Sequence, residues 1–198
     1  MIRPKGRRNR EHSGACLVEN AIAVNPAHAG VRGVIEALKK GSRLVLVRCD
    51  SWSDEKLVDL AKAARDHASA AMIVGHGRLH EDFSVTGLLK RPRVLGPVAI
   101  RADRWPDMTI DPELLKRDPV IDHGASWVLA LLCAANGGEV VSTDAYHARR
   151  LRRDAHDIDE LRPEGRAWLV THGQRMIPEH AIGQNEAHAL WKAWSGAR

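Results

Sequence analysis

The sequence predicts a single α/β domain over residues 15–198, and three observations support this fold class. Short aliphatic runs alternate with longer segments whose apolar residues recur at helical spacing. The composition, 44% hydrophobic and 28% charged, is ordinary for a soluble globular protein, and 198 residues can bury a real core. Finally, residues 127–135 form an apolar run with almost no polar face, which predicts a buried central helix.

The elements are predicted from apolar periodicity and turn residues. In the segment after Asn25-Pro26, Val31, Val34, Ile35 and Leu38 share one helix face, and Gly41 ends that helix. The run RLVLVR at 43–48 is the clearest strand. The predicted strands are 15–24, 43–48, 70–75, 94–100 (broken at Gly96-Pro97), 139–143 and 167–171, and the predicted helices are 27–40, 54–67, 125–135, 158–161 and 185–194.

The central helix carries the most informative surroundings. Asp122 is a residue type that caps a helix start, and Asn136-Gly137 tolerates a left-handed turn at the end. His123 stands at the helix mouth, where backbone N–H groups favour anions and a side chain can face a cleft. The alternative is that His123 only caps or packs.

The net charge of +5 comes from one segment. Residues 1–10, MIRPKGRRNR, carry five basic and no acidic residues, so the rest of the chain is neutral. We predict a basic flexible tail over 1–14, which leaves nucleic-acid contact as a minority function of this tail or of RRLRR at 149–153.

The same reading of composition bears on localisation. The tail lacks the apolar stretch of a secretory signal, and no apolar run approaches the about 18 residues of a membrane span. The three cysteines, Cys16, Cys49 and Cys133, have no metal-type spacing, so we expect reduced thiols and a cytoplasmic protein without membrane contact.

The order of segments resembles the 3,4-dihydroxy-2-butanone-4-phosphate synthase family, a lyase of riboflavin biosynthesis. The resemblance covers about residues 28–183 and rests on pattern and spacing; it is carried by GVRGVIEALKKGSRLVLV (30–47), SDEKLVDLAKAARDHASAAMIVG (53–75), IDHGASWVLALLCAANGG (121–138) and RRDAHDIDELRPEGRAWLVTHGQRMIPE (152–179). It implies an α/β sandwich with a mixed sheet, related to the threonylcarbamoyl-adenylate synthase fold, and a homodimer with active sites near the subunit interface.

This chain departs from the family in the residues that carry the family's chemistry. The family carries an acidic loop, D-D-E-D-R-E-N-E-G-D, that supplies acid/base groups and a magnesium-ligating glutamate; here the strand runs directly into RCDSWSDEK (48–56). His123 matches the family's metal-binding histidine, but Gly124-Ala125 replaces Thr-Glu. Magnesium is therefore compatible with the resemblance, yet its ligand set is incomplete and no metal ligand is assigned.

We predict a catalytic set of His123, Asp50 and Asp144. Each aspartate closes a β-branched run, and ligands of α/β proteins gather beyond the carboxyl ends of strands. An imidazole between carboxylates can act as general acid or base near neutral pH. The structural alternative is that each aspartate caps a turn.

Substrate binding is assigned by the resemblance to four further residues. Thr86-Gly87 and Arg93 in TGLLKRPR echo the family's phosphate-binding T-G-x-x-x-x-x-R pattern, although its intervening residues are lost. Arg149 and Arg150 correspond to arginines near the family's active site, and could equally lie on a solvated helix face.

Three classes of function remain open. The first is a diverged enzyme of the lyase or isomerase type, acting on a small phosphorylated or polyhydroxylated metabolite rather than on ribulose 5-phosphate. The second is a non-catalytic relative that binds a metabolite or a partner protein. The third is a nucleic-acid-associated protein, against which the neutral body counts.

Overall fold

The structure is a computed structural model of the chain. It describes residues 20–47, 54–75, 82–90, 93–95, 97–110, 112, 116, 124–143, 158–160, 177–183, 185, 186, 188, 189 and 192. In order, the elements are β1 (Ala21–Val24), α1 (Pro26–Lys39), β2 (Leu44–Val47), α2 (Asp54–Asp66), β3 (Met72–Val74), α3 (Val85–Lys90), β4 (Arg93–Leu95), β5 (Val98–Arg101), α5 (Ala125–Ala135), β6 (Val140–Ser142), β7 (Ile158–Glu160) and the 3-10 helix η3 (Glu179–Ala181).

The main sheet has five strands in the order β1-β2-β5-β3-β6. β1 pairs parallel with β2, and β3 pairs parallel with β6, whereas β5 is antiparallel to both of its neighbours. Four strands therefore run in one direction and β5 in the other. This confirms the predicted α/β class with a mixed sheet.

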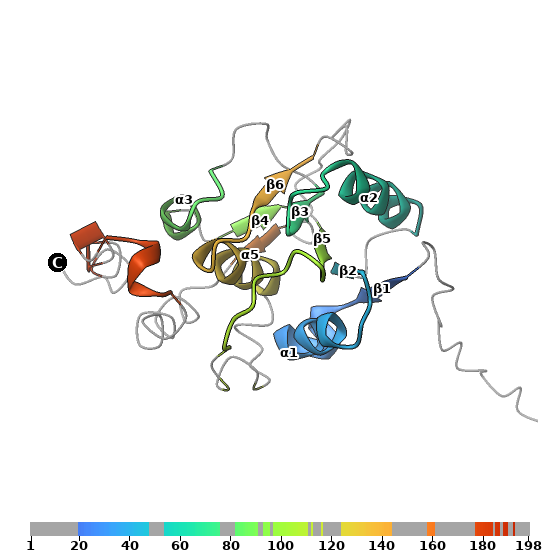
Figure 1. The fold of residues 1–198 in the computed structure, drawn as a ribbon, viewed down its shortest axis with the longest axis horizontal. Helices are drawn as coiled ribbons and strands as arrows, with labels where there is room; N and C mark the ends of the chain where they lie inside the picture. The colour runs from blue at the N-terminus through green and yellow to red at the C-terminus, as the bar shows by residue number, and fades with distance from the viewer. Residues whose placement is uncertain are drawn as a thin grey trace, which may run out of the picture.

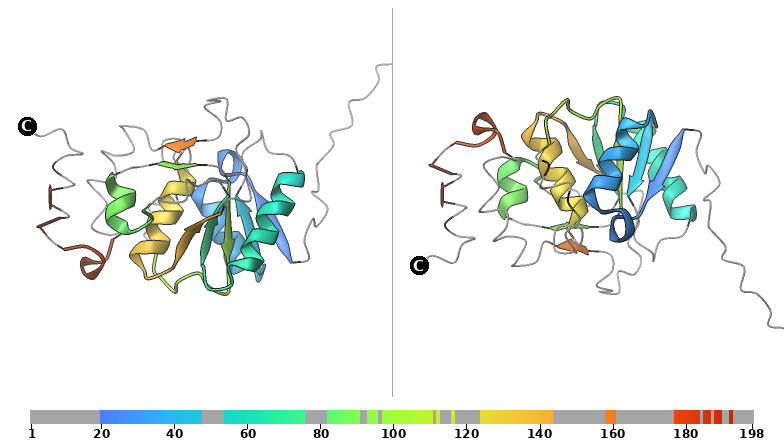
Figure 2. Two further views of the ribbon diagram at one scale, coloured as in Figure 1. Left: turned by 90° about the horizontal axis from the view of Figure 1, so that it is seen from above. Right: turned by 90° about the horizontal axis from the view of Figure 1, so that it is seen from below.

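Helices cover both faces of this sheet, as the two views of Figure 2 show. Alternate strand residues point to opposite faces: Val45 and Met72 join one core cluster with α1 and α5, whereas Leu46 and Ile73 join another with α2. Figure 1 shows α1 and α2 on either side of the strands. The result is three layers, with the larger core on the α1 and α5 side.

Helix α5 is the most deeply buried helix of the described chain. All of its residues except Ala134 are buried, as its apolar sequence predicts. At its end the Gly138 N–H donates to the Cys133 carbonyl (2.9 Å) and the Gly137 N–H donates to the Ala134 carbonyl (3.2 Å). This is a Schellman ending, and Gly137, with φ 80°, supplies the left-handed residue it requires.

Most predicted elements are confirmed within two residues at each end. The helix predicted at 125–135 has those limits, and the strands predicted at 43–48, 70–75 and 139–143 are β2, β3 and β6. The described residues between 185 and 192 are helical, in agreement with the predicted last helix. The strand predicted at 167–171 lies outside the described residues.

Helix α1 contains a break that its apolar periodicity did not predict. Gly30 has φ 67° and ψ −179°, a region open essentially to glycine alone. A Cβ at Gly33 would lie 2.4 Å from the Ala29 Cβ, so a second glycine lets the two helical pieces approach. The first turn after β1 is thereby set off from the regular helix that follows.

The helix predicted at 158–161 is wrong. Ile158–Glu160 is instead strand β7, which pairs antiparallel with β4 in a separate two-stranded sheet. In the register of this pair, Arg93 is the partner of Glu160 and Leu95 is the partner of Ile158. Pairing with a distant segment therefore overrides the local helical pattern.

Candidate functional site

The four parallel strands define two ends of the sheet. Val24, Val47, Val74 and Ser142 close β1, β2, β3 and β6 at what we call the carboxyl end; the opposite end is the amino end. Helix α5 is joined to β6 by only the four residues 136–139, so it runs back along the sheet and begins toward the carboxyl end. Strand ends and a helix start that meet in this way are where α/β proteins build ligand sites.

The start of α5 is formed by backbone rather than by a capping side chain. Gly124 occupies the N-cap position, and its carbonyl accepts the first helical hydrogen bond from the Val128 N–H (3.0 Å). The prediction that Asp122 caps this helix is wrong, because the cap position falls two residues later, on a residue without a side chain. The first N–H groups of α5 thus receive no hydrogen bond from their N-cap residue.

Trp127 fixes the orientation of this helix start. Its side chain is fully buried, as predicted, and its Nε1–H donates to the Leu88 carbonyl at 2.9 Å. Leu88 lies in α3, so this bond ties α5 to α3 across the core. A rigid helix start is a precondition for presenting a neighbouring side chain to a ligand.

Ser126 is a residue that the sequence reasoning passed over. It is 1% exposed and is the one buried polar residue of the described chain. It lies in the first turn of α5, two positions after the N-cap glycine. The sequence could have pointed to this residue, because Ser126 is the one hydroxyl side chain in an otherwise apolar helix.

The three predicted catalytic residues, His123, Asp50 and Asp144, lie outside the described residues. Their sequence neighbours are described: Gly124 opens α5, Val47 ends β2, and Thr143 follows β6, where its N–H donates to the Val74 carbonyl (2.9 Å). These neighbours all belong to the carboxyl end of the sheet. The catalytic roles of His123, Asp50 and Asp144 stay predictions.

The strand order places β2 and β6 at different distances from α5. β5 and β3 lie between β2 and β6, so the ends of β2 and β6 are roughly 14 Å apart. Helix α5 contacts β6 directly and is linked to it by the short connection. Among these two strands, β6 is therefore the one that lies next to α5.

Thr86 and Arg93 stand on different elements. Thr86 is half-buried on the short helix α3, and Arg93 is the first residue of β4. The glycine of the Thr-Gly pair has a structural explanation: the Gly87 N–H donates to the Ser84 Oγ (3.1 Å), and a Cβ at this position would collide with the Asp82 carbonyl. The Ser84 Oγ caps α3 by accepting this N–H, so the N–H is not a free donor for a phosphate.

Asp82 completes this helix start. Its Oδ1 accepts from the Ser84 N–H at 2.9 Å, and the hydrogen bonds from Ser84 lower the pKa of the Asp82 carboxyl. Arg149 and Arg150 lie outside the described residues. The predicted substrate-binding roles of all four residues stay predictions.

Cys133 is not a nucleophile in this fold. The thiol is buried in α5, and its burial raises the pKa to about 12, so thiolate is scarce at neutral pH. Among the described residues no three His, Cys, Asp or Glu side chains come close enough together to hold a metal ion. The described part of the chain therefore gives magnesium no ligand set.

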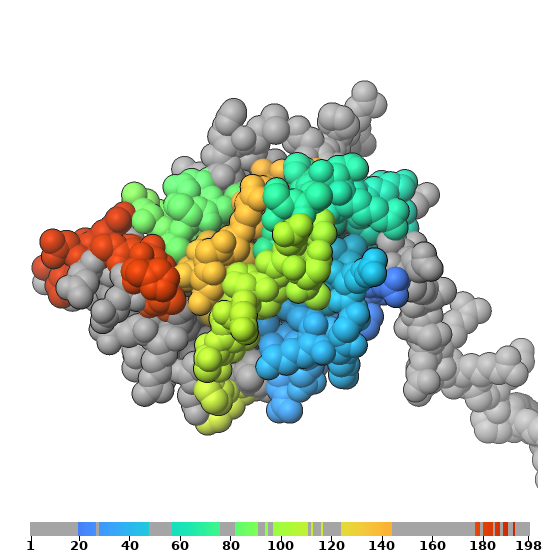
Figure 3. Space-filling model, in the orientation of Figure 1, coloured from blue at the N-terminus to red at the C-terminus, as the bar shows by residue number. Residues whose placement is uncertain are grey.

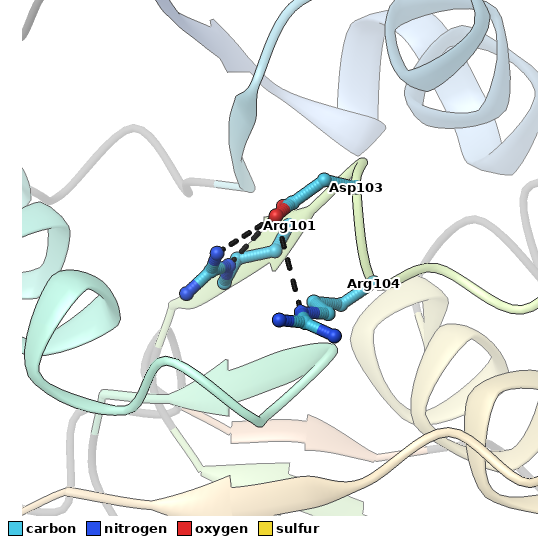
Figure 4. A network of polar contacts seen from close by, with 3 residues as sticks. All are labelled: Arg101, Asp103 and Arg104. Carbon is cyan, nitrogen blue, oxygen red and sulfur yellow. Dashed lines mark hydrogen bonds and ion pairs between the residues drawn. The ribbon is translucent and has the colours of Figure 1, made fainter.

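A charged network lies at the amino end, away from the candidate site (Figure 4). Arg101 donates to Asp103 through both Nε (3.2 Å) and Nη2 (2.8 Å), and Arg104 Nε lies 3.9 Å from the same carboxylate. The hydrogen bonds from Arg101 lower the pKa of Asp103. This network holds the turn after β5 and is structural in role.

Comparison with known proteins adds no identification: no family model, no curated protein and no solved structure matches this chain. None of the helices in the described ranges is long and apolar enough to span a membrane.

Proposed function

We propose that the protein is a diverged relative of the dihydroxybutanone phosphate synthases, an enzyme of the lyase or isomerase type for a small phosphorylated or polyhydroxylated metabolite. One observation supports this above the others: β2 and β6 both end, and α5 begins, on the carboxyl side of a mixed sheet. His123, Asp50 and Asp144 adjoin these three points in the sequence.

The chemistry we assign is proton transfer next to a carbonyl. A neutral imidazole at position 123 can take a proton from a carbon or hydroxyl of the substrate and return it elsewhere, near neutral pH. Asp144 orients that imidazole and stabilises its charged form. Asp50, on the other side of β5 and β3, binds hydroxyl groups of the substrate.

The reaction of the dihydroxybutanone phosphate synthases on ribulose 5-phosphate is not the one we propose. β2 ends at Val47 and α2 begins at Asp54, so only six residues join them. The family's ten-residue acidic loop does not fit into that connection. With ribulose 5-phosphate and magnesium we expect little or no formate, well below the about one turnover per second of ordinary enzymes.

A metabolite panel tests the proposal. The purified protein is screened by thermal shift against sugar phosphates, polyols and their unphosphorylated analogues, followed by a turnover assay on each compound that binds. His123→Ala should abolish turnover and weaken binding while leaving the melting temperature of the free protein within a degree or two, because cleft substitutions usually change stability little.

His67→Ala is the matched control, since His67 is a half-buried histidine after α2 at the amino end. It should change neither binding nor turnover. Binding without turnover would support the non-catalytic relative instead, and binding that His67→Ala weakens more than His123→Ala would refute the site.

A further inference from the structure

Strand β1 is an outer strand with a free side. The Asn20 carbonyl accepts from the N–H groups of Leu44, the first residue of β2, and of Arg43 just before it (3.3 and 3.1 Å). The backbone N–H and C=O groups of successive residues point to alternate sides of a strand. The backbone groups of Ile22 therefore point toward β2, and those of Ala21 and Ala23 point away from it. Within the described part of the chain, no hydrogen bond satisfies the outward N–H and C=O groups of these two alanines.

The strand lacks the usual protection of an exposed edge. Its sequence, AIAV, has no charge and no proline, and the register with β2 shows no bulge. Natural proteins place charges, prolines or bulges on such strands to prevent pairing with another chain. Among the features of the described residues, only its shortness protects β1, which lies beside α1 in Figure 3.

The side chain of Ile22, in the middle of β1, is exposed. It is 40% exposed, and it is the one exposed large hydrophobic residue of the described chain. Val24, two residues on, packs into the core cluster of α1 and α5, so Ile22 is on that face of the sheet as well. The exposed isoleucine therefore lies on the α1 side of an unpaired strand.

We propose that β1 is the contact between two copies of this chain, paired antiparallel about a twofold axis at Ile22. In that register Ala21 faces the partner's Ala23, and Ala23 faces the partner's Ala21. Each is a hydrogen-bonded pair that exchanges two bonds, so every outward group of both strands is satisfied. Ile22 meets the partner's Ile22 in the non-hydrogen-bonded pair between them, where side chains approach most closely.

The same axis brings the two copies of α1 together. α1 contacts β1 and β2 to a similar extent, so it lies above the space between them. Strands are about 4.8 Å apart, which places the two helices roughly 10 Å from each other, the spacing of packed helices. Antiparallel helices centred between Arg32 and Glu36 set each of these exposed residues opposite its counter-charge on the partner.

The helices are needed as well as the strands. A specific interface buries roughly 1,200–2,000 Å² in total, more than four residues of strand can supply. Arg32 and Glu36, joined within each helix at 2.7 Å, would form a four-charge network across the axis. The dimer joins two five-stranded sheets into one continuous sheet.

Sedimentation or light scattering of the full chain at loadings from about 1 to about 100 µM tests the proposal. The chain should dimerise, and Ile22→Lys should raise the dissociation constant at least about tenfold, because it places two like charges at the axis. A chain that stays monomeric throughout, or a dimer that Ile22→Lys leaves intact, overturns the proposal.

A charge exchange tests the helix contact. Arg32→Glu should weaken the dimer, and the double variant Arg32→Glu/Glu36→Arg should restore it, since the exchange recreates the pair within and between the helices. Lys62→Glu is the matched control: Lys62 has an ion pair of its own with Asp59, on the opposite face of the sheet, and its reversal should leave the dimer unchanged. A dimer as sensitive to Lys62→Glu as to Arg32→Glu would contradict the assigned surface.

Discussion

The hydrogen bond between Trp127 and Leu88 should be one of the larger single contributions to stability. Leu88 is two residues from the end of α3, so its carbonyl lacks a partner within the helix and depends on the indole N–H at 2.9 Å. Trp127→Phe leaves that buried carbonyl unsatisfied, which costs about 1–3 kcal/mol. The smaller ring also leaves a void of roughly 40 Å³, worth about 1 kcal/mol more.

The expected loss is therefore about 2–4 kcal/mol in the free energy of unfolding. Urea denaturation followed by circular dichroism measures it, with an unchanged dependence on urea as the sign that the folded state is intact. Trp105→Phe is the matched control, because Trp105 is only partly buried and the structure shows no hydrogen bond from its indole. A loss below about 1 kcal/mol for Trp127→Phe, or an equal loss for both variants, would refute the reasoning.

Three further predictions concern the backbone and titrating groups. Gly30→Ala should lower the free energy of unfolding by about 1–3 kcal/mol, because Gly30 is buried at φ 67° and ψ −179°. Gly41→Ala should cost less, because Gly41 (φ 84°) has open space around it. Equal melting temperatures of the two variants would contradict this. The pKa of Cys133 is raised to about 12 from 9.0, so the stability it contributes is complete below pH 9 and is lost as the pH rises towards 12. Cys133→Ala should show less of this alkaline loss, and iodoacetamide should label Cys133 only after unfolding. The pKa of Asp103 is lowered by its hydrogen bonds from Arg101, so its contribution to stability is present above about pH 4 and is lost as the pH falls through the lowered pKa. Asp103→Asn should therefore lower the free energy of unfolding by at most about 1 kcal/mol at pH 7, because solvent screens this pair, and should change nothing in strong acid.

The parts of the fold that the sequence predicted are those where local pattern and tertiary packing agree. Helix α5 has apolar residues all round and a glycine pair at its end, and the structure buries nearly all of it. The run LVLV of β2 is buried on both faces, as expected for an inner strand.

The failures have two causes, which are contact with a distant part of the chain and local backbone geometry. Ile158–Glu160 is too short to determine its own conformation, and pairing with β4 makes it a strand. The break at Gly30 follows from fitting the turn after β1 against the rest of α1, which periodicity does not report. The cap of α5 fell on Gly124 because backbone geometry, rather than residue preference, set the helix start.

For the candidate site, the sequence could propose a position and a set of residues, and both stay predictions. The rule that ligands gather beyond the carboxyl ends of strands needed only the order of strands and helices, so the sequence could propose a position for the site. The strand order was needed to see that β5 and β3 separate the ends of β2 and β6. Sequence spacing carries no such information, because strand order is not sequence order.

We propose that a small metabolite binds at the carboxyl end of the sheet, next to the start of α5. The most direct measurement is amide chemical-shift mapping of the labelled full chain, titrated with each sugar phosphate that the thermal-shift screen identifies. The amides of Gly75, Gly124 and Thr143, at the carboxyl end, should shift with the ligand, and those of Ala102 and Gly137, at the amino end, should not. Shifts confined to the amino end, or none with any ligand that raises the melting temperature, would contradict the account.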